Sequence, residues 1–309
     1  MIELDPIGTL VVIAVGITAG ILGSMLGLGG GFIIVPALAF MGIEPSRIAG
    51  TSMFTVLSTS ASSIASYARQ KGSGMSNSKA DDSSSINDRI STNSSSDDIG
   101  SNDDGGGVNN NDRRERSKKR RSIGRGRIDY ATALKLAIFA LPGAVIGAYS
   151  SSMLDLSSFK LYFALLLTGV AVYMLINPYY HVKEKHYSTY IPYAVSFLSG
   201  FIASLFGVGG GAILVPMMLM VLRMDMHVTV PTVHLIILLS SISGVATHTM
   251  LGHPEYMLAM MLVGGTFIGA QIGSRLLGKT RDLVLRRLVS IAMMMVAARL
   301  IYDSIIVKA

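Results

Sequence analysis

One glycine-rich block occurs twice in this chain and constrains its fold more than any other feature. Residues 20 to 38 read GILGSMLGLGGGFIIVPAL, and residues 200 to 218 read GFIASLFGVGGGAILVPMM. In each block an apolar helical stretch is interrupted by glycines and followed by a second apolar run that holds a proline. A membrane chain that repeats such a broken helix is typically built from two copies of one fold, with a binding site where the copies meet.

The composition is that of an integral membrane protein. Of the 309 residues, 50% are hydrophobic and 15% are charged, and the mean hydropathy is +0.52. A soluble domain of this size could not bury so many apolar side chains. Eight apolar runs have close to the roughly 20 residues that cross a bilayer as a helix, and two shorter runs follow the glycine blocks. The long runs are 7–26, 49–67, 131–151, 159–176, 190–206, 228–250, 256–277 and 283–302, and the short ones are 31–42 and 211–222.

Charge placement predicts that the short runs also cross. If only the eight long runs crossed, the basic groups at 113–127 and 275–287 would lie on opposite sides. With ten crossings, both groups share one side with Lys183, Lys185 and Arg223, as the positive-inside rule requires. The expected fold is therefore an all-α, multi-pass protein of the plasma membrane with both termini outside the cell.

Each half of this scheme holds five segments, and an odd number inverts the second half relative to the first. The expected repeats cover residues 1–178 and 179–309. Two more pairs of blocks occur in the same order in both halves: AGTS at 49–52 with VPTV at 230–233, and PGAVIGA at 142–148 with GGTFIGA at 264–270.

A polar insert over residues 72–127 interrupts the first repeat. Residues 72–112 are mainly Ser, Asp, Asn and Gly, a composition typical of a disordered linker. Nine Lys or Arg residues follow between Arg113 and Arg127. We interpret them as a cytoplasmic cluster that contacts anionic lipid rather than nucleic acid.

The glycine blocks are the strongest candidate site. Each ends in a glycine triplet, Gly29, Gly30 and Gly31 or Gly209, Gly210 and Gly211, and each triplet opens a new helix. The start of a helix presents free N–H groups and a partial positive charge, both of which attract anions. Two such starts meeting from inverted halves would hold an anion near the middle of the membrane. Close helix packing is the alternative, and it is the interpretation for the glycines at 16/20, 23/27, 143/147 and 265/269/273.

Polar side chains within the apolar runs supply further candidates. Thr51, Ser52 and Thr232 begin matching helices and could donate to an oxyanion. His234 follows the position that matches Ser52, and Gln271 lies beside packing glycines. Both polar side chains are costly to place in a bilayer, so both are candidates for anion binding. A structural role remains the alternative for each. For Arg299, an ion pair with Asp303 one helical turn away is the simpler interpretation.

Other classes of protein are disfavoured. The chain has no cysteine and no GxxxxGK[ST] or HExxH motif, so no cofactor, metal site or enzyme activity is predicted. The apolar runs are almost free of Asp and Glu, which argues against a cation pathway. An intramembrane serine hydrolase with Ser24 as nucleophile and His234 as base is a weaker alternative.

Residues 23–38, AGTS at 49–52 and FGVGGGAILVPMM at 206–218 resemble the TauE/SafE family of sulfite-exporter-like membrane proteins. The resemblance implies transport of small sulfur-containing anions such as sulfite or organosulfonates, with the glycine triplets, Thr51 and Ser52 in the transport core. The second half departs from the family pattern, because VPTVH replaces the small–Thr–Ser element.

The sequence thus predicts a secondary transporter, more specifically an exporter, that works by alternating access. A passive anion channel is the main alternative, and a structural scaffold or receptor is a lesser one. A proton or a sodium ion is left open as the coupling ion, and no oligomeric state is predicted.

Overall fold

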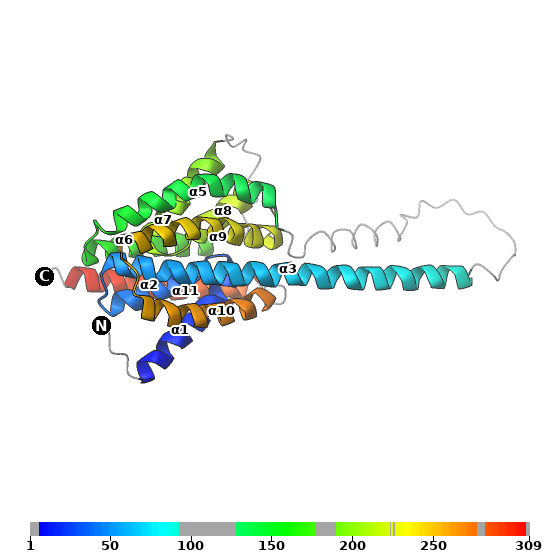
Figure 1. The fold of residues 1–309 in the computed structure, drawn as a ribbon, viewed down its shortest axis with the longest axis horizontal. Helices are drawn as coiled ribbons and strands as arrows, with labels where there is room; N and C mark the ends of the chain where they lie inside the picture. Colours follow the sequence, from blue (N-terminus) through cyan, green and yellow to red (C-terminus); the bar gives the residue numbers. More distant parts are fainter. Residues whose placement is uncertain are drawn as a thin grey trace.

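The computed structural model describes residues 6–92, 128–176, 190–222, 224, 226–276 and 282–306, and this part of the chain is helical with no strand. This confirms the all-α class (Figure 1). The helices are α1 (Pro6–Leu26), α2 (Gly31–Phe40), α3 (Pro45–Thr92), α5 (Tyr130–Ser151), α6 (Leu156–Ile176), α7 (Ile191–Phe206), α8 (Gly211–Met220), α9 (Met226–Met250), α10 (Tyr256–Leu276) and α11 (Asp282–Ile306).

Length and composition support a multi-pass membrane protein. In the described part of the chain, four helical stretches are long and apolar enough to span a bilayer: Gly8–Leu26, Tyr130–Ser151, Val228–Met250 and Tyr256–Leu276. Three shorter helical stretches are also apolar: Gly31–Phe40, Leu156–Val172 and Ile191–Phe206. Large apolar side chains such as Leu134 on α5 and Met260 on α10 are exposed, as expected where a helix faces lipid.

Helices of the two sequence halves are interleaved (Figure 1). In the first half, α1 packs along α10 of the second, and α5 packs along α7 in the same way. The central helices α3 and α9 pack on each other, α10 also contacts α3, and α5 also contacts α9. Exchanging each helix for its counterpart in the other half therefore reproduces the main packing pairs.

Glycines make the α1–α10 and α5–α7 contacts close. A Cβ atom on Gly20 would lie 2.4 Å from the carbonyl oxygen of Thr266, and one on Gly200 would lie 2.1 Å from that of Ala140. A Cβ on Gly143 would lie 2.2 Å from the carbonyl oxygen of Phe197, and one on Gly269 would lie 2.1 Å from that of Ile17. The predicted packing role of the glycines at 16/20, 143/147 and 265/269/273 is confirmed, because only residues without a side chain permit this approach. For the pair 23/27 the prediction is wrong: a Cβ on Gly23 would lie 2.2 Å from the amide nitrogen of Gly30, and Gly27 lies beyond the end of α1 with positive φ, so both belong to the turn between α1 and α2.

Helix α3 is longer than the sequence pattern predicts. We expected its helix to end near Tyr67 and a disordered linker to begin at residue 72, but the backbone stays helical to Thr92 and projects beyond the bundle (Figure 1). No proline occurs between residues 46 and 92, and extending an existing helix is much easier than starting one. The rest of the insert, including the basic cluster at 113–127, lies outside the described residues.

Candidate functional site

Two glycine loops break the helices at the points that the sequence predicts. Residues 27–30 join α1 to α2, and residues 207–210 join α7 to α8. Within each loop three glycines adopt positive φ, with values of 73°, 85° and 80° at Gly27, Gly29 and Gly30. The corresponding values are 77°, 95° and 66° in the second loop. A side chain at these positions would be strained, so the sharp reversals depend on glycine.

The two loops lie against each other in opposite directions. A Cβ on Gly31 would be 2.3 Å from the carbonyl oxygen of Gly207, and one on Gly211 would be 1.8 Å from that of Gly27. Between these contacts, a Cβ on Gly29 would lie 3.5 Å from the Cα of Gly209. All residues of both loops are buried. The repeated blocks, far apart in sequence, therefore form one continuous structure, which we call the loop crossing (residues 27–31 and 207–211).

The loop crossing lies beside the central helix α3, about a quarter of the way along it. A Cβ on Gly209 would be 2.8 Å from Cγ1 of Val56, and one on Gly29 would be 3.4 Å from the same atom. Val56 is eleven residues after Pro45, the first residue of α3, which is about 16 Å along the helix axis. That distance is about half of a 30 Å hydrocarbon core.

Free amide groups gather at the crossing. Within the described residues, the amides of Gly30, Gly31 and Phe32 at the start of α2 donate to no protein acceptor. The amides of Gly210 and Ala212 at the start of α8 are equally unengaged. Buried N–H groups without an acceptor are rare in proteins, and these could donate to an anion.

Thr51 and Thr232 occupy matching positions, but their hydroxyl groups are already engaged. Thr51 Oγ1 accepts a 3.0 Å hydrogen bond from the amide of Glu255, and Thr232 Oγ1 accepts one of 3.0 Å from the amide of Asp129. Thr232 also donates to the carbonyl of Val228. Each threonine therefore connects one half of the sequence to the first turn of a helix from the other half.

Ser52 lies closer to the crossing than either threonine. Its Oγ donates to the carbonyl of Ala49, 3.1 Å away, and a Cβ on Gly207 would be 1.7 Å from that Oγ. The structure does not bring Gln271 to the loops. Gln271 lies two residues from both Gly269 and Gly273, which face α1, so it points to another side of α10 and is partly exposed.

His234, on α9, contacts the last turns of α1, just before the first loop. Its Nε2 is 3.2 Å from the carbonyl oxygen of Ser24, and the hydroxyl of Tyr67 donates to the same oxygen at 2.9 Å. The hydroxyl of Ser24 instead donates to the carbonyl of Ile21. A Ser24–His234 nucleophile and base would need contact between the ring and the hydroxyl, so the arrangement contradicts the hydrolase alternative.

The second half repeats this arrangement with a different residue. His248, at the position of α9 that matches Tyr67, places Nε2 3.0 Å from the carbonyl oxygen of Ser204, the counterpart of Ser24. His248 Nδ1 is also 2.9 Å from Nδ1 of His253. The ends of α1 and α7 therefore make the same kind of contact, a ring group of the central helix against a carbonyl oxygen.

The hydroxyl groups of α3 fall into three sets. Thr55 and Thr59 donate to carbonyls of their own helix, whereas Ser58 and Ser62 donate to α10 at Val263 and Phe267. Among described residues with buried side chains, Ser60 Oγ, Ser63 Oγ and His234 Nδ1 have no partner. The sequence analysis did not single out Ser60 or Ser63. No local signal separates them from the other hydroxyl residues of this helix, because Val56 and Tyr67, which flank them on one helix face, make their contacts only in the folded protein.

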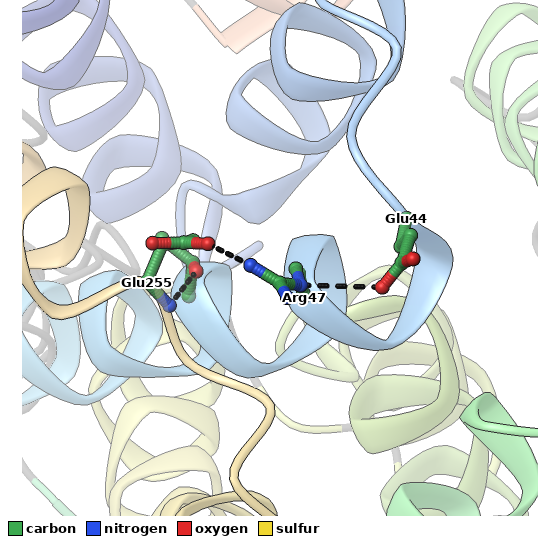
Figure 2. A network of polar contacts seen from close by, with 4 residues as sticks. Glu44, Arg47 and Glu255 are labelled. Carbon is green, nitrogen blue, oxygen red and sulfur yellow. Dashed lines mark hydrogen bonds and ion pairs between the residues drawn. The ribbon is translucent and has the colours of Figure 1, made fainter. Parts of the chain in front are cut away.

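An ion-pair network lies at one end of the bundle. Figure 2 shows Arg47, at the start of α3, between Glu44 and Glu255. The Arg47–Glu44 pair is 3.2 Å long, and Glu255 also donates its amide to Thr51. On α11, Arg299 pairs with Asp303 at 3.5 Å, as the sequence predicts.

Comparison with known proteins identifies the family. The profile of the family described as sulfite exporter TauE/SafE matches residues 12–75 and 120–300, leaving out most of the insert. The chain belongs to the TauE/SafE family. As a TauE/SafE protein it is a multi-pass membrane transporter, which confirms the resemblance predicted from the glycine blocks.

Two relatives of this TauE/SafE chain extend over nearly its whole length. The probable membrane transporter protein YunE of Bacillus subtilis (strain 168) is 24% identical over 96% of this chain and 98% of its own. The probable membrane transporter protein ORF9 of Sinorhizobium sp. is also 24% identical, over 92% of this chain and 89% of its own. No solved structure matches the chain.

Proposed function

We propose that this protein is a secondary transporter that exports small sulfur-containing anions, organic or inorganic, by alternating access. The observation that carries the proposal is the loop crossing, where two helix starts with free amides meet inside a protein of the sulfite exporter family. The anion would be held by these amides near the middle of the membrane.

The surrounding helices would bind an anion through uncharged groups rather than through charged side chains. The described parts of α1, α2, α8 and α9 contain no Asp, Glu, Lys or Arg. Amides and hydroxyls donate several hydrogen bonds to a sulfur oxyanion without the cost of burying a cationic side chain. A site of this kind also releases its anion more easily than a site with a permanent countercharge.

We further propose ten membrane segments in two inverted repeats, residues 1–178 and 179–309. The matched helix pairs and the opposite directions of the two loops support this arrangement. Helix α3 projects from one end of the bundle, and α11 ends at the other, so the insert and the C-terminus would lie on opposite sides of the membrane (Figure 1). With the basic insert in the cytoplasm, as the positive-inside rule predicts, the termini would lie outside the cell.

The packing suggests which parts move. Because α1 joins α10, and α5 joins α7, through backbone contacts at glycines, each pair would move as a rigid unit. These units combine helices of both repeats, so the two sequence halves would not rock as separate bodies. Sliding at the loop crossing would expose the amides first to one side and then to the other.

Flux measurements in proteoliposomes test this proposal. In Gly30→Leu and Gly210→Leu, a Cβ would meet Ala19 at 3.2 Å or Ser199 at 2.4 Å, so the crossing must distort. We expect sulfite or organosulfonate flux to fall at least about tenfold, while the protein still inserts. Gly42→Leu is the matched control, because the φ of Gly42 is 73°, between the 80° of Gly30 and the 66° of Gly210, but nothing lies within 4 Å of its Cβ position.

Normal flux in both loop variants would reject the loop crossing as the transport site. A carrier should show saturation and exchange of labelled anion across the membrane. Single-channel currents in planar bilayers would instead identify the passive channel.

A further inference from the structure

Three buried polar groups near the loop crossing lack hydrogen-bond partners. They are Ser60 Oγ, Ser63 Oγ and Nδ1 of His234, and all three residues are 0% exposed. Buried hydroxyls in helices normally donate to a carbonyl one turn earlier, as Thr55 and Thr59 do on the same helix. Leaving three such groups unpaired is unfavourable unless something else binds them.

These groups share one region between α3 and α9. Val56, Ser60, Ser63 and Tyr67 follow the spacing of a single helix face. Val56 contacts both glycine loops at one end of this face. At the other end, the ring of Tyr67 lies 6.1 Å from that of His234, centroid to centroid. Along α3, the two serines therefore lie between Val56, which contacts the loop crossing, and Tyr67, which contacts His234.

The other half of the protein has no unpaired polar group at the matching positions. The positions that match Ser60, Ser63 and His234 are Ser241, Gly244 and Met53. The hydroxyl of Ser241 donates a hydrogen bond to the carbonyl of Leu238, and the other two residues carry no polar side chain. Since the same packing forms without them, the fold does not require the unpaired groups. This asymmetry points to a ligand.

The hydrogen bonds of His234 determine where it can take up a proton. A carbonyl oxygen only accepts, so Nε2, which faces the Ser24 carbonyl, carries the hydrogen. In the neutral ring, Nδ1 is then a free lone pair that cannot donate to an anion. After protonation, Nδ1–H becomes a donor with a positive charge.

Few other groups near His234 titrate. Tyr67 faces it from α3 and the Ser24 carbonyl from α1. The described parts of α1 and α8 have no acid or base. On α3, α5, α7 and α9, the remaining described groups that titrate or carry charge lie elsewhere on their helices: Arg47, Arg69, Tyr130, Lys135, Tyr149, Tyr193 and His248.

We propose that Ser60, Ser63 and His234 complete the anion site beside the loop crossing, and that the anion binds together with one proton on Nδ1 of His234. The serine hydroxyls and the new Nδ1–H donate to the oxyanion, and the imidazolium balances its charge. No covalent bond other than N–H forms. This inference rests on the proposed function, because the anion that binds with the proton is taken to be the transported solute.

Calorimetric titration of the purified full-length protein tests the inference. Sulfate and methanesulfonate are suitable probes, because their charge is constant between about pH 5 and 8. Titration in buffers of different ionisation enthalpy gives the number of protons taken up per anion. For the wild type we expect close to one proton near pH 7.5 and tighter binding as the pH falls.

The variants separate the roles of the three residues. His234→Met copies the matching residue of the first half and should bind without proton uptake, at least about tenfold more weakly. Ser60→Ala and Ser63→Ala should weaken binding but keep the proton number. Without ligand they should unfold at a higher temperature, because each removes an unpaired hydroxyl. Ser241→Ala, on α9, is the control and should bind normally.

The binding data distinguish a failure of the proposed function from a failure of this inference alone. If the wild type binds neither sulfate, methanesulfonate nor sulfite, both the proposed function and this inference are overturned. If the wild type binds an anion but the Ser60, Ser63 and His234 variants match it in affinity and proton number, only this inference is overturned.

Discussion

The hydroxyl of Tyr67 donates a 2.9 Å hydrogen bond to the carbonyl oxygen of Ser24. Tyr67 is 1% exposed, and the carbonyl belongs to the last turns of α1 before the first glycine loop. In the second half, His248 makes the corresponding contact to Ser204. Removing the Tyr67 hydroxyl tests how much this contact stabilises the loop.

Tyr67→Phe should lower the free energy of unfolding by about 1 kcal/mol, because the ring remains and one buried hydrogen bond is lost. Tyr67→His, which copies the second half, should be less harmful than Tyr67→Leu. Thermal or denaturant unfolding in detergent measures both effects. The exposed Tyr162 provides a control, Tyr162→Phe, that should have no effect. Equal stability of Tyr67→Phe and wild type would contradict the prediction.

Thr51→Val and Thr232→Val should each destabilise the protein by about 1–2 kcal/mol. Each change leaves a helix-start amide, of Glu255 or Asp129, without its acceptor. Thr→Ser at either position keeps the hydroxyl and should largely preserve stability. Unfolding curves for the four variants make the comparison, and a similar loss in the Ser variants would show that the methyl group, not the hydroxyl, is responsible.

Gly269→Ala should disrupt the contact between α1 and α10. Its Cβ would lie 2.1 Å from the carbonyl oxygen of Ile17, so the helices must separate, at a cost of about 1–3 kcal/mol. Gly264→Ala on the same helix meets nothing within 4 Å and should stabilise slightly through its better helix propensity. Opposite signs in the unfolding data are expected, and equal effects would exclude the packing explanation.

Stability should fall in mildly acidic solution. Burial lowers the pKa of His253, in the loop between α9 and α10, below the ordinary 6.5. A group with a lower pKa in the folded state adds stability that is complete above the unfolded value and is lost as the pH falls below it. His253 also lies against His248, so charging both rings would add repulsion.

The wild-type unfolding temperature should therefore drop between about pH 7.5 and 5.5, and the drop should be smaller in His253→Gln. His234 and His248 remain in the variant, so a residual drop is expected. The same drop in both proteins would show that His253 does not contribute.

The helices themselves could be predicted from the sequence. The bounds of α5 and α10 differ from the predicted runs by one residue, because long apolar runs are flanked by polar or turn-forming residues. The glycine triplets also marked both breaks, since only glycine tolerates the positive φ found at Gly29 and Gly209. The sequence could not show that α3 runs to Thr92, because the Ser- and Asp-rich segment has no strong preference for helix or coil.

What the sequence by itself determined was thus the helical class, the repeated glycine block and the two breaks, because each depends on local apolar pattern and on glycine. Only the tertiary structure decided which helices pair across the halves, because an apolar helix surface accepts many partners. It also decided the state of each polar group. Thr51 and Thr232, alike in sequence, are both engaged by distant amides, whereas Ser60 and Ser63 are buried without a partner. That difference arises from residues far apart in the chain and cannot be read from local pattern.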